Sequence, residues 1–248
     1  MAEQLKKNFS SLAGFYNKLM ENIDYSLWAK YLFDITVKYN VPVKTVLEIG
    51  GGNGKLATAL SKKFPDYYLS EKSSLFLAGS RFRKNRVCCD MNALPFKPHF
   101  DLVFAAFDTI NYLPSQKSFA MLLAGVSSIL NEEGVFTFDV SLEKNSLAHS
   151  TGKKKIHHYH NQKIEHLSVY DQVRRIHTNE FVFYKDGAVV EKEIHKEKIF
   201  PFEFYFAQVE KSSFYIVDCL EAFGFRKGKP TSRRVQFILK KVKEYAKL

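Results

Sequence analysis

The sequence is short of the features that mark secreted and membrane proteins. It has three cysteines among 248 residues, an odd number that does not form a disulfide framework. No apolar run approaches the roughly 18 residues that a membrane span requires, and the polar residues 1–10 contain no signal-peptide core. We therefore expect reduced cysteines and a cytoplasmic protein with no membrane partner.

A convincing metal site is also missing from the sequence. Six of the eight histidines lie between His149 and His177. His158 and His160 would share one face of a strand, but no cysteine or carboxylate stands at ligand spacing from them. We interpret this segment as polar and solvated, and we predict no metal.

The net charge of +11 is distributed unevenly along the chain. Residues 1–140 hold 16 Lys and Arg against 13 Asp and Glu, whereas residues 141–248 hold 21 against 13. A basic half is typical of proteins that bind an anionic partner such as RNA. Here lysines and glutamates are mixed, as in 191–198, which favours an ordinary solvated surface. Nucleic acid is therefore an alternative partner that we do not favour.

What the sequence does contain is a regular alternation of apolar strands and amphipathic helices. Helical patterns separate short apolar runs, and residues 1–40 have helical spacing that would form a cap. Parallel neighbouring strands need such crossover connections, so the pattern predicts an α/β fold with a doubly wound, mostly parallel sheet and helices on both faces. The predicted strands are 44–49, 67–70, 86–89, 100–106 and 135–139, and the predicted helices are 55–64, 73–82 and 117–130.

The pattern changes after the fifth predicted strand. Residues 143–165 are polar and predict a loop, and they precede alternating β-like runs. The sequence Lys-Asp-Gly at 185–187 favours a tight hairpin turn between two of these runs. The predicted strands are 167–176, 180–184 and 188–200, followed by a helix at 212–223 and a last strand at 234–239. We predict a catalytic domain of residues 1–149 and 208–248, with 150–207 inserted as an antiparallel lid, substrate or dimer subdomain.

The strongest local signal is a glycine-rich turn between the first strand and the next helix. Glycines there allow a sharp turn and a close approach of the backbone to a ligand. The dinucleotide-binding pattern G-x-G-x-x-G fails, because Lys55 occupies the position of its third glycine. The other ligand class is S-adenosylmethionine, whose ammonium group favours a nearby carboxylate such as that of Glu48. The four glycines are Gly50, Gly51, Gly52 and Gly54.

Carboxylates follow the next two predicted strands. Glu71 lies 21 residues after Gly50, an offset at which an acid accepts both ribose hydroxyls of a nucleotide. Asp90 follows the third strand, where it would accept from the adenine amine while Met91 packs on the ring. We place these residues in one cofactor site, together with Lys72 beside Glu71.

The segment after the fourth strand would meet the methyl acceptor, because ligands of open α/β sheets bind beyond the carboxyl ends of the strands. We assign Phe107 to the cofactor side. Asp108 is the first candidate to orient a substrate amine or take its proton, although capping of the following segment is an alternative role. Tyr112 is the second candidate, followed by the histidines of the inserted strands.

These motifs resemble class I S-adenosylmethionine-dependent methyltransferases, which have a Rossmann-like fold. The resemblance rests on 46–56, Glu71, Asp90 and 100–113. The stretch 107–113 is similar to that of amino-sugar and glycine-type N-methyltransferases, which also insert antiparallel strands after the fifth strand. Within that family an aromatic residue matching Tyr16 closes over the cofactor. As a departure, the region before the last predicted helix, Phe-Glu-Phe-Tyr-Phe-Ala-Gln, lacks the arginine of amino-sugar relatives.

The resemblance implies transfer of a methyl group from S-adenosylmethionine to a nitrogen or oxygen atom of a small molecule, leaving S-adenosylhomocysteine. Methyl transfer from a sulfonium is an in-line displacement that depends on alignment and exclusion of water, so an acid–base triad is not obligatory. An RNA or protein methyltransferase is one alternative. A binding module that holds the cofactor without turnover is another.

Overall fold

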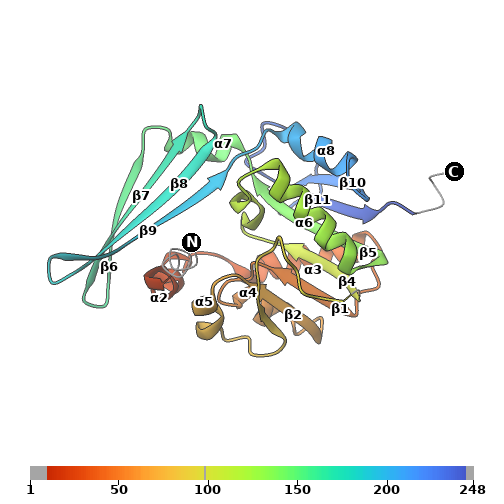
Figure 1. Cartoon of the computed structure of the whole chain (residues 1–248), viewed down its shortest axis with the longest axis horizontal. Coiled ribbons are helices and arrows are strands. Elements are labelled where there is room, and N and C mark those ends of the chain that lie inside the picture. The colour runs from red at the N-terminus through yellow and green to blue at the C-terminus, as the bar shows by residue number, and fades with distance from the viewer. Residues whose placement is uncertain (1–9, 98, 244–248) are drawn as a thin grey trace.

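The computed structural model describes residues 10–97 and 99–243, and its chain forms two parts (Figure 1). The larger part is built on a seven-stranded sheet of order β10-β11-β5-β4-β1-β2-β3, and the smaller on a four-stranded sheet of order β6-β7-β8-β9. The strands of the larger sheet are β1 (Thr45–Ile49), β2 (Asp66–Glu71), β3 (Arg86–Cys88), β4 (Phe100–Ala105), β5 (Leu130–Ser141), β10 (Phe214–Glu221) and β11 (Arg234–Lys241).

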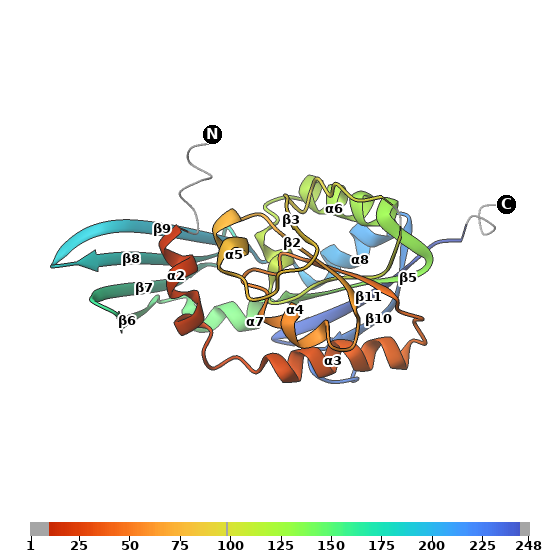
Figure 2. The same cartoon turned by 90° about the horizontal axis from the view of Figure 1, so that it is seen from below.

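Helices cover both faces of the large sheet because its central strands are apolar on both sides. Figure 2 shows α3 and α4 on one face and α6 and α8 on the other. Successive residues of β1 point to opposite faces, so Val46 packs on the α3 side and Leu47 on the α6 side. The helices are α2 (Ser10–Leu19), α3 (Tyr25–Lys38), α4 (Lys55–Leu60), α5 (Ser74–Gly79), α6 (Gln116–Ile129), α7 (Glu143–Ser146) and α8 (Phe202–Glu210).

The direction of the strands confirms the predicted fold class. Strands β3, β2, β1, β4 and β5 are parallel neighbours, whereas β11 pairs antiparallel with β5 and β10 antiparallel with β11. The crossover helices therefore bring the carboxyl ends of β1, β2, β3 and β4 to one edge of the sheet. Among the helices of the described residues, none has the length and apolar character needed to cross a bilayer.

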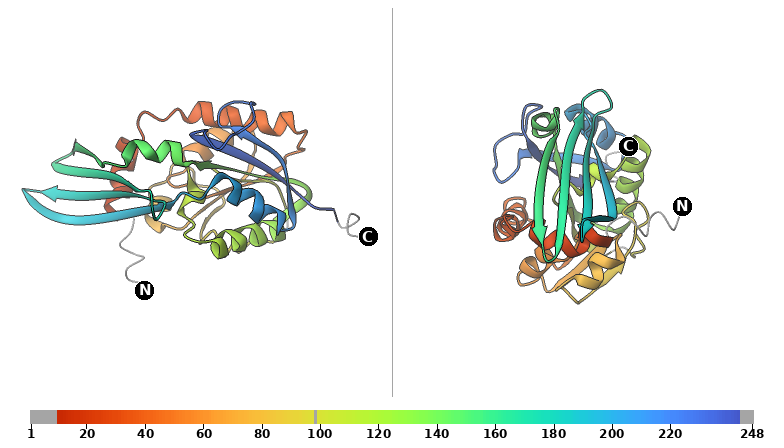
Figure 3. Two further views of the ribbon diagram at one scale, coloured as in Figure 1. Left: turned by 90° about the horizontal axis from the view of Figure 1, so that it is seen from above. Right: turned by 90° about the vertical axis from the view of Figure 1, so that its left-hand side faces the viewer.

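The smaller sheet consists of β6 (Lys153–Tyr159), β7 (Gln162–Asp171), β8 (Ile176–Lys185) and β9 (Ala188–Lys198), all antiparallel. The predicted hairpin turn joins β8 to β9, and Asp186 and Gly187 both adopt positive φ, as a two-residue hairpin turn requires. Helix α2 lies across the strands of this sheet (Figure 3), where Leu12 and Phe15 pack in one apolar cluster with β7 and β8. Residues 1–9 of the predicted helical cap lie outside the described residues.

The helix predicted at 212–223 is wrong, because this segment forms β10. Phe214, Cys219 and Leu220 are buried, and β10 completes the sheet by pairing with β11. Short apolar runs do not distinguish a strand from a buried helix by periodicity alone. The aromatic and β-branched residues of Phe-Tyr-Ile-Val, at the start of β10, favour the strand.

The loop predicted at 143–165 and the continuous strand predicted at 167–176 are also wrong. Residues 143–149 form α7 and the short 3-10 helix η2 (Leu147–His149), and β6 follows with its lysines exposed. Exposed lysines are typical of an edge strand, because they oppose pairing with another chain. Strand β7 ends at Asp171, and a turn with Arg175 at φ 53° leads into β8.

Asn111 joins the two parts of the molecule. It is fully buried in the 3-10 helix η1 (Thr109–Tyr112), between β4 and α6. Its Nδ2 donates to the carbonyls of Ser141 at 3.2 Å and Lys198 at 3.1 Å, and its Oδ1 accepts from the Ser141 N–H at 2.9 Å. One amide thus holds the end of β9 beside the end of β5.

We expect Asn111→Ala to lower the free energy of unfolding by about 2–4 kcal/mol, because it leaves buried backbone groups without partners. Urea unfolding monitored by circular dichroism measures the change. Asn161→Ala, at an exposed turn position between β6 and β7, is the matched control and should change stability by less than about 0.5 kcal/mol. Equal midpoints for the two variants would contradict this role of Asn111.

Candidate functional site

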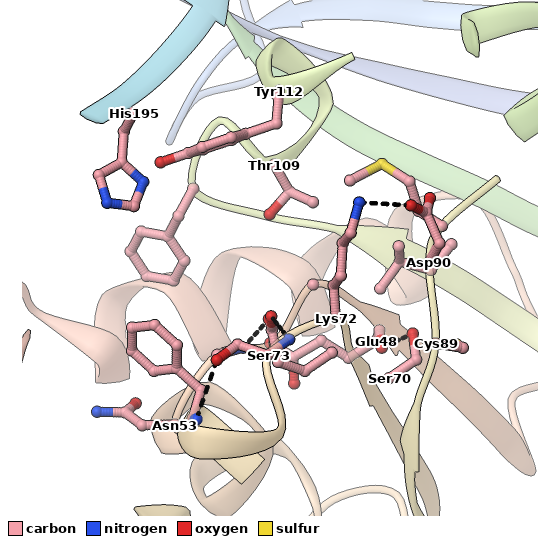
Figure 4. A pocket seen from close by; sticks show the side chains of 18 of the residues that line it. Glu48, Asn53, Ser70, Lys72, Ser73, Cys89, Asp90, Thr109, Tyr112 and His195 are labelled. Atoms are coloured by element: carbon pink, nitrogen blue, oxygen red, sulfur yellow. Dashed lines mark hydrogen bonds and ion pairs between the residues drawn. The ribbon is translucent and has the colours of Figure 1, made fainter. Parts of the chain in front are cut away.

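A cavity of about 1020 Å³ opens at the carboxyl ends of the parallel strands. Its floor is the turn after β1 and the tips of β2 and β3, and one wall is the segment after β4 (Figure 4). Helix α2 and strand β9 close it on the side of the smaller sheet, through Leu12, Tyr16, Ile194, His195 and Lys196. Open α/β sheets bind their ligands at this position, in the crevice outside the carboxyl ends of the strands.

The glycine turn has a left-handed backbone that side chains rarely adopt. Gly50, Gly52 and Gly54 have φ of 67°, 55° and 71°. A Cβ added at Gly51 would lie 1.9 Å from Leu69 Cδ1, so packing alone excludes a side chain there. A Cβ at Gly52 would meet no atom within 4 Å. Because Gly52 lines the cavity, this open space lies where a ligand approaches the backbone.

Glu48 lies at the floor of the cavity and is almost fully buried, with 2% of its surface exposed. Its Oε2 accepts a 2.6 Å hydrogen bond from the Tyr67 hydroxyl. Burial raises the pKa of Glu48 to about 8, the Tyr67 bond opposes this rise, and the nearby carboxylate of Glu71 adds to it. Glu48 is therefore mostly protonated at neutral pH when no cation is near, and a cationic ligand would favour its ionised form.

Backbone amides from two elements fix the orientation of Glu71. The Gly52 N–H donates to its Oε2 at 3.0 Å, and the Ser73 N–H donates to its Oε1 at 2.8 Å. Burial raises the pKa of Glu71, although these N–H bonds oppose the rise. Each carboxylate oxygen has a second acceptor position, so a carboxylate held in this way still has capacity for two hydroxyl groups of a ligand.

Lys72 and Asp90 form an ion pair across the tips of β2 and β3, with Nζ 2.7 Å from Oδ2 (Figure 4). The Asn92 N–H donates to the other oxygen of Asp90 at 2.9 Å. Partial burial works against the charge of Asp90, but Lys72 and Asn92 outweigh it and lower its pKa. Met91 also lines this end of the cavity, so the residues predicted for the adenine side lie together.

Aromatic residues line the opposite side of the cavity. The ring of Tyr16 packs edge-on against Phe76 at 4.9 Å. Phe107 lies 4.4 Å from Trp28 and 5.3 Å from Tyr25, measured between ring centroids. Phe107 and Asp108 both have positive φ, near 60°, a conformation that is strained for residues other than glycine and that concentrates at functional sites.

Two of the predicted site residues do not line the cavity. Gly54 precedes α4 with φ 71°, and a Cβ there would lie 2.3 Å from Ser80 Oγ. Asp108 is engaged elsewhere, because its Oδ2 lies 2.6 Å from Arg234 Nη2. The Asp108 side chain does not cap η1 either. The other predicted residues line the cavity: Tyr16, Glu48, Gly50, Gly51, Gly52, Glu71, Lys72, Asp90, Met91, Phe107 and Tyr112.

Arg234 is a residue that no sequence motif singles out. It stands at the start of β11, pairs with both Asp108 and Asp139, and lies 5.7 Å from the centre of the Trp28 ring. Asp139 is fully buried and also accepts from the Asp108 N–H at 3.1 Å. The side chain of Asp108 is therefore part of a buried charge cluster that fixes the segment after β4.

Tyr112 and His195 face each other at the end of the cavity away from Asp90. Their ring centroids are 6.2 Å apart with the rings nearly perpendicular, and Figure 4 shows the Tyr112 hydroxyl directed toward His195. Burial raises the pKa of Tyr112 well above its ordinary value, with the charge of Glu197 as the next cause. Tyr112 still keeps 39% of its surface exposed because its ring faces the open cavity.

Comparison with known proteins agrees with this geometry. A family model described as a methyltransferase domain matches residues 18–176, which is more than half of the chain. The chain belongs to the methyltransferase domain family. The matched residues include the glycine turn, Glu71, Asp90, and the segment from Phe107 to Tyr112. Within the described residues no cluster of His, Cys, Asp or Glu is arranged to hold a metal ion.

The similarity to known proteins extends over nearly the whole chain. A protein of Geobacillus sp. (strain WCH70), provisionally named a methyltransferase, is 25% identical over 94% of this chain and 99% of its own. A crystal structure of an S-adenosylmethionine-dependent methyltransferase from Clostridium acetobutylicum ATCC 824 has a TM-score of 0.79 and 20% identity, covering 95% and 99% of the two chains. The sugar N-methyltransferase KedS8 from Streptoalloteichus sp. ATCC 53650 has a TM-score of 0.76 and 16% identity, covering 91% of each chain.

We expect Glu48→Gln to raise the free energy of unfolding of the ligand-free protein relative to wild type. The difference should grow as pH rises from about 4.5 to 8. The folded pKa is near 8 and the ordinary value is 4.5, so over this window unfolding releases a proton and wild-type stability falls. The glutamine variant avoids that loss, which reaches at most about 5 kcal/mol. Thermal unfolding from pH 5 to 9 tests it. Glu210→Gln, at an exposed position of α8, is the control, and a pH-independent difference for Glu48→Gln would refute the assignment.

Proposed function

We propose that the protein transfers the methyl group of S-adenosylmethionine to a nitrogen or oxygen atom of a small molecule. The observation that carries this proposal is the open space in front of the Gly52 backbone, with the carboxylates of Glu48 and Glu71 beside it in one cavity. Membership of the methyltransferase domain family supports the reaction type. The likeness of the fold to S-adenosylmethionine-dependent enzymes supports the cofactor.

The residues that line the cavity fit this cofactor group by group. The ammonium of its methionine part would approach Glu48, because a nearby cation lowers the cost of ionising that buried carboxyl. Glu71 would accept the ribose hydroxyls, and its two backbone N–H bonds already fix its orientation. Asp90 and Met91 would contact the adenine beside Lys72. When bound, the cofactor supplies an electrophilic methyl group on a sulfonium.

The chain's own part in the reaction is alignment and exclusion of water. Tyr16 on α2 and Phe107 after β4 line the cavity and would cover the cofactor. An acceptor would enter between Tyr112 and β9, in line with the sulfonium. The pKa of Tyr112 is raised, so its hydroxyl stays protonated at neutral pH and is suited to donate a hydrogen bond.

The cavity favours a small acceptor over a macromolecule. It is bounded by α2 on one side and by β9 of the smaller sheet on another, and its volume of about 1020 Å³ has to contain both cofactor and acceptor. KedS8, which has this fold, is a sugar N-methyltransferase, and this supports an amine acceptor. A homodimer formed through the smaller sheet and a cytoplasmic location stay predictions.

We expect Gly52→Ala to weaken S-adenosylhomocysteine binding about 100-fold or more, because a methyl group would occupy the space that the cofactor needs. Glu71→Ala should weaken it about 10-fold to 100-fold through loss of charge-assisted hydrogen bonds. Isothermal titration calorimetry measures both. Gly187→Ala is the matched control, since Gly187 also has positive φ and its added Cβ also meets nothing within 4 Å, but it does not line the cavity. Normal affinity in both site variants would remove the assignment.

An acceptor screen tests the reaction itself. We expect the purified protein, given S-adenosylmethionine labelled in its methyl group, to label at least one member of a panel of amino sugars, glycine, sarcosine and phenols. Label should transfer at a rate that the Gly52→Ala variant lowers at least 100-fold. Transfer of label to bulk RNA or to protein, with none to the panel, would favour the macromolecular alternative. Cofactor binding without any transfer would favour a non-catalytic module.

A further inference from the structure

Strand β9 carries two buried residues, His195, which lines the cavity, and Glu193, which lies beside it. We propose that His195 takes the proton of the methyl acceptor and that Glu193 is the positioning residue that holds its ring and stabilises its charged form. This inference rests on the proposed function and adds to it the group that makes an amine or hydroxyl acceptor nucleophilic. Sequence reasoning did not name His195, although it considered the histidines of the inserted strands.

His195 is a buried residue in the wall of the cavity. Only 4% of its surface is exposed, yet it lines the cavity. Its ring lies 5.9 Å from that of Phe181 and 6.2 Å from that of Tyr112, both nearly edge-on. These neighbours restrict the ring, which also borders the cavity where the acceptor would bind. A general base has to reach the proton it removes, and this geometry allows it.

The carboxylate of Glu193 lies beside the His195 ring. Glu193 and His195 are two residues apart on one strand, so their side chains lie on the same face. Glu193 Oε2 is 3.6 Å from His195 Nε2, and both side chains are buried. The other oxygen, Oε1, accepts a 2.7 Å hydrogen bond from the Leu12 N–H of α2. The backbone of a second element thus fixes the carboxylate beside the imidazole, where it would form an ion pair with the protonated ring.

The alternative bases are less suited to this step. Asp108 does not line the cavity, and its carboxylate is paired with Arg234. Burial raises the pKa of Tyr112 well above its ordinary value, so the tyrosine is not ionised at neutral pH. Among the histidines of the smaller sheet, His177 is held between Ser146 and Ser168 by hydrogen bonds of 2.9 and 2.8 Å. Of the histidines in the described residues, His195 is the one that lines the cavity.

In the proposed reaction a proton moves to His195 and a methyl group moves to the acceptor. An acceptor ammonium gives one proton to the His195 imidazole and becomes a neutral amine with a free lone pair. The nitrogen forms a bond to the methyl carbon while the carbon–sulfur bond breaks, and its electron pair stays on sulfur as the thioether. The imidazolium, paired with the Glu193 carboxylate, then loses its proton to water. With a hydroxyl acceptor the same imidazole takes the O–H proton as the bond to carbon forms.

Several ionisable groups surround His195 and belong in any interpretation of its pH dependence. They lie on β9 itself, on β7, on η1 and on α2. Asn179, which pairs with His195 in the β8–β9 register, links to both His166 and Glu197 through hydrogen bonds. The groups are Glu193, Glu197, His166, Tyr112 and Tyr16.

The test compares His195→Gln and Glu193→Gln with wild type, using the panel acceptor that wild type methylates fastest. We expect His195→Gln to lower kcat/KM about 100-fold near neutral pH. Its rate should keep rising with pH where wild type levels off, because the acceptor must then arrive already neutral. Affinity for S-adenosylhomocysteine should stay within about twofold of wild type by calorimetry, since His195 lies on the acceptor side. His158→Gln, at an exposed position of β6, is the matched control.

Glu193→Gln should lower kcat about 10-fold with little change in KM and move the acid limb of the rate profile, and Glu193→Asp should restore part of the loss. A wild-type rate or an unchanged pH profile in His195→Gln overturns the proposal. A parallel loss of cofactor affinity does so too, because it would mean that His195 only supports the fold. If wild type itself binds no cofactor or labels no acceptor, the proposed function fails, and that result is distinct from an unaffected variant.

Discussion

The site depends on one constraint, which is the left-handed backbone between β1 and α4. Positive φ at Gly50, Gly52 and Gly54 lets the chain turn within a few residues and directs the Gly52 N–H to the carboxylate of Glu71. That bond ties the tip of β2 to the turn after β1. Burial raises the pKa of Glu48 and of Glu71, and the charge of Glu71 adds to the rise at Glu48. Ionising these buried carboxyls has an electrostatic cost that a cationic ligand relieves.

The smaller sheet matters because it is fixed to this site at two points. Asn111 holds the end of β9 beside β5 through buried hydrogen bonds. At the other point the Leu12 N–H of α2 donates to Glu193 of β9. Because α2 also brings Tyr16 to the cavity, the cofactor side and the acceptor side share one helix. The smaller sheet, through β9, therefore forms part of the wall of the site.

Charge clusters outside the cavity set the shape of its acceptor side. Asp108 and Asp139 both pair with Arg234, and the Asp108 backbone adopts positive φ next to Phe107. Residues 202–208 contain no arginine, and this segment packs as α8, with Tyr205 and Val209 in the core. The arginine that reaches this region comes from β11 instead. Removing one member of such a buried cluster leaves an uncompensated charge, so its role is to fix geometry.

The sequence by itself determined the parallel core and its ligand edge, because the alternation of apolar strands with helices, the glycine spacing and the acids Glu71 and Asp90 are local patterns. It failed at 212–223, where periodicity alone does not distinguish a helix from a strand and pairing with β11 decides. Tertiary structure alone decided that Asp108 is bound to Arg234, 126 residues away, and that Glu193 contacts α2, 181 residues away. Such contacts depend on how elements distant in the chain pack together, which no local pattern of residues encodes.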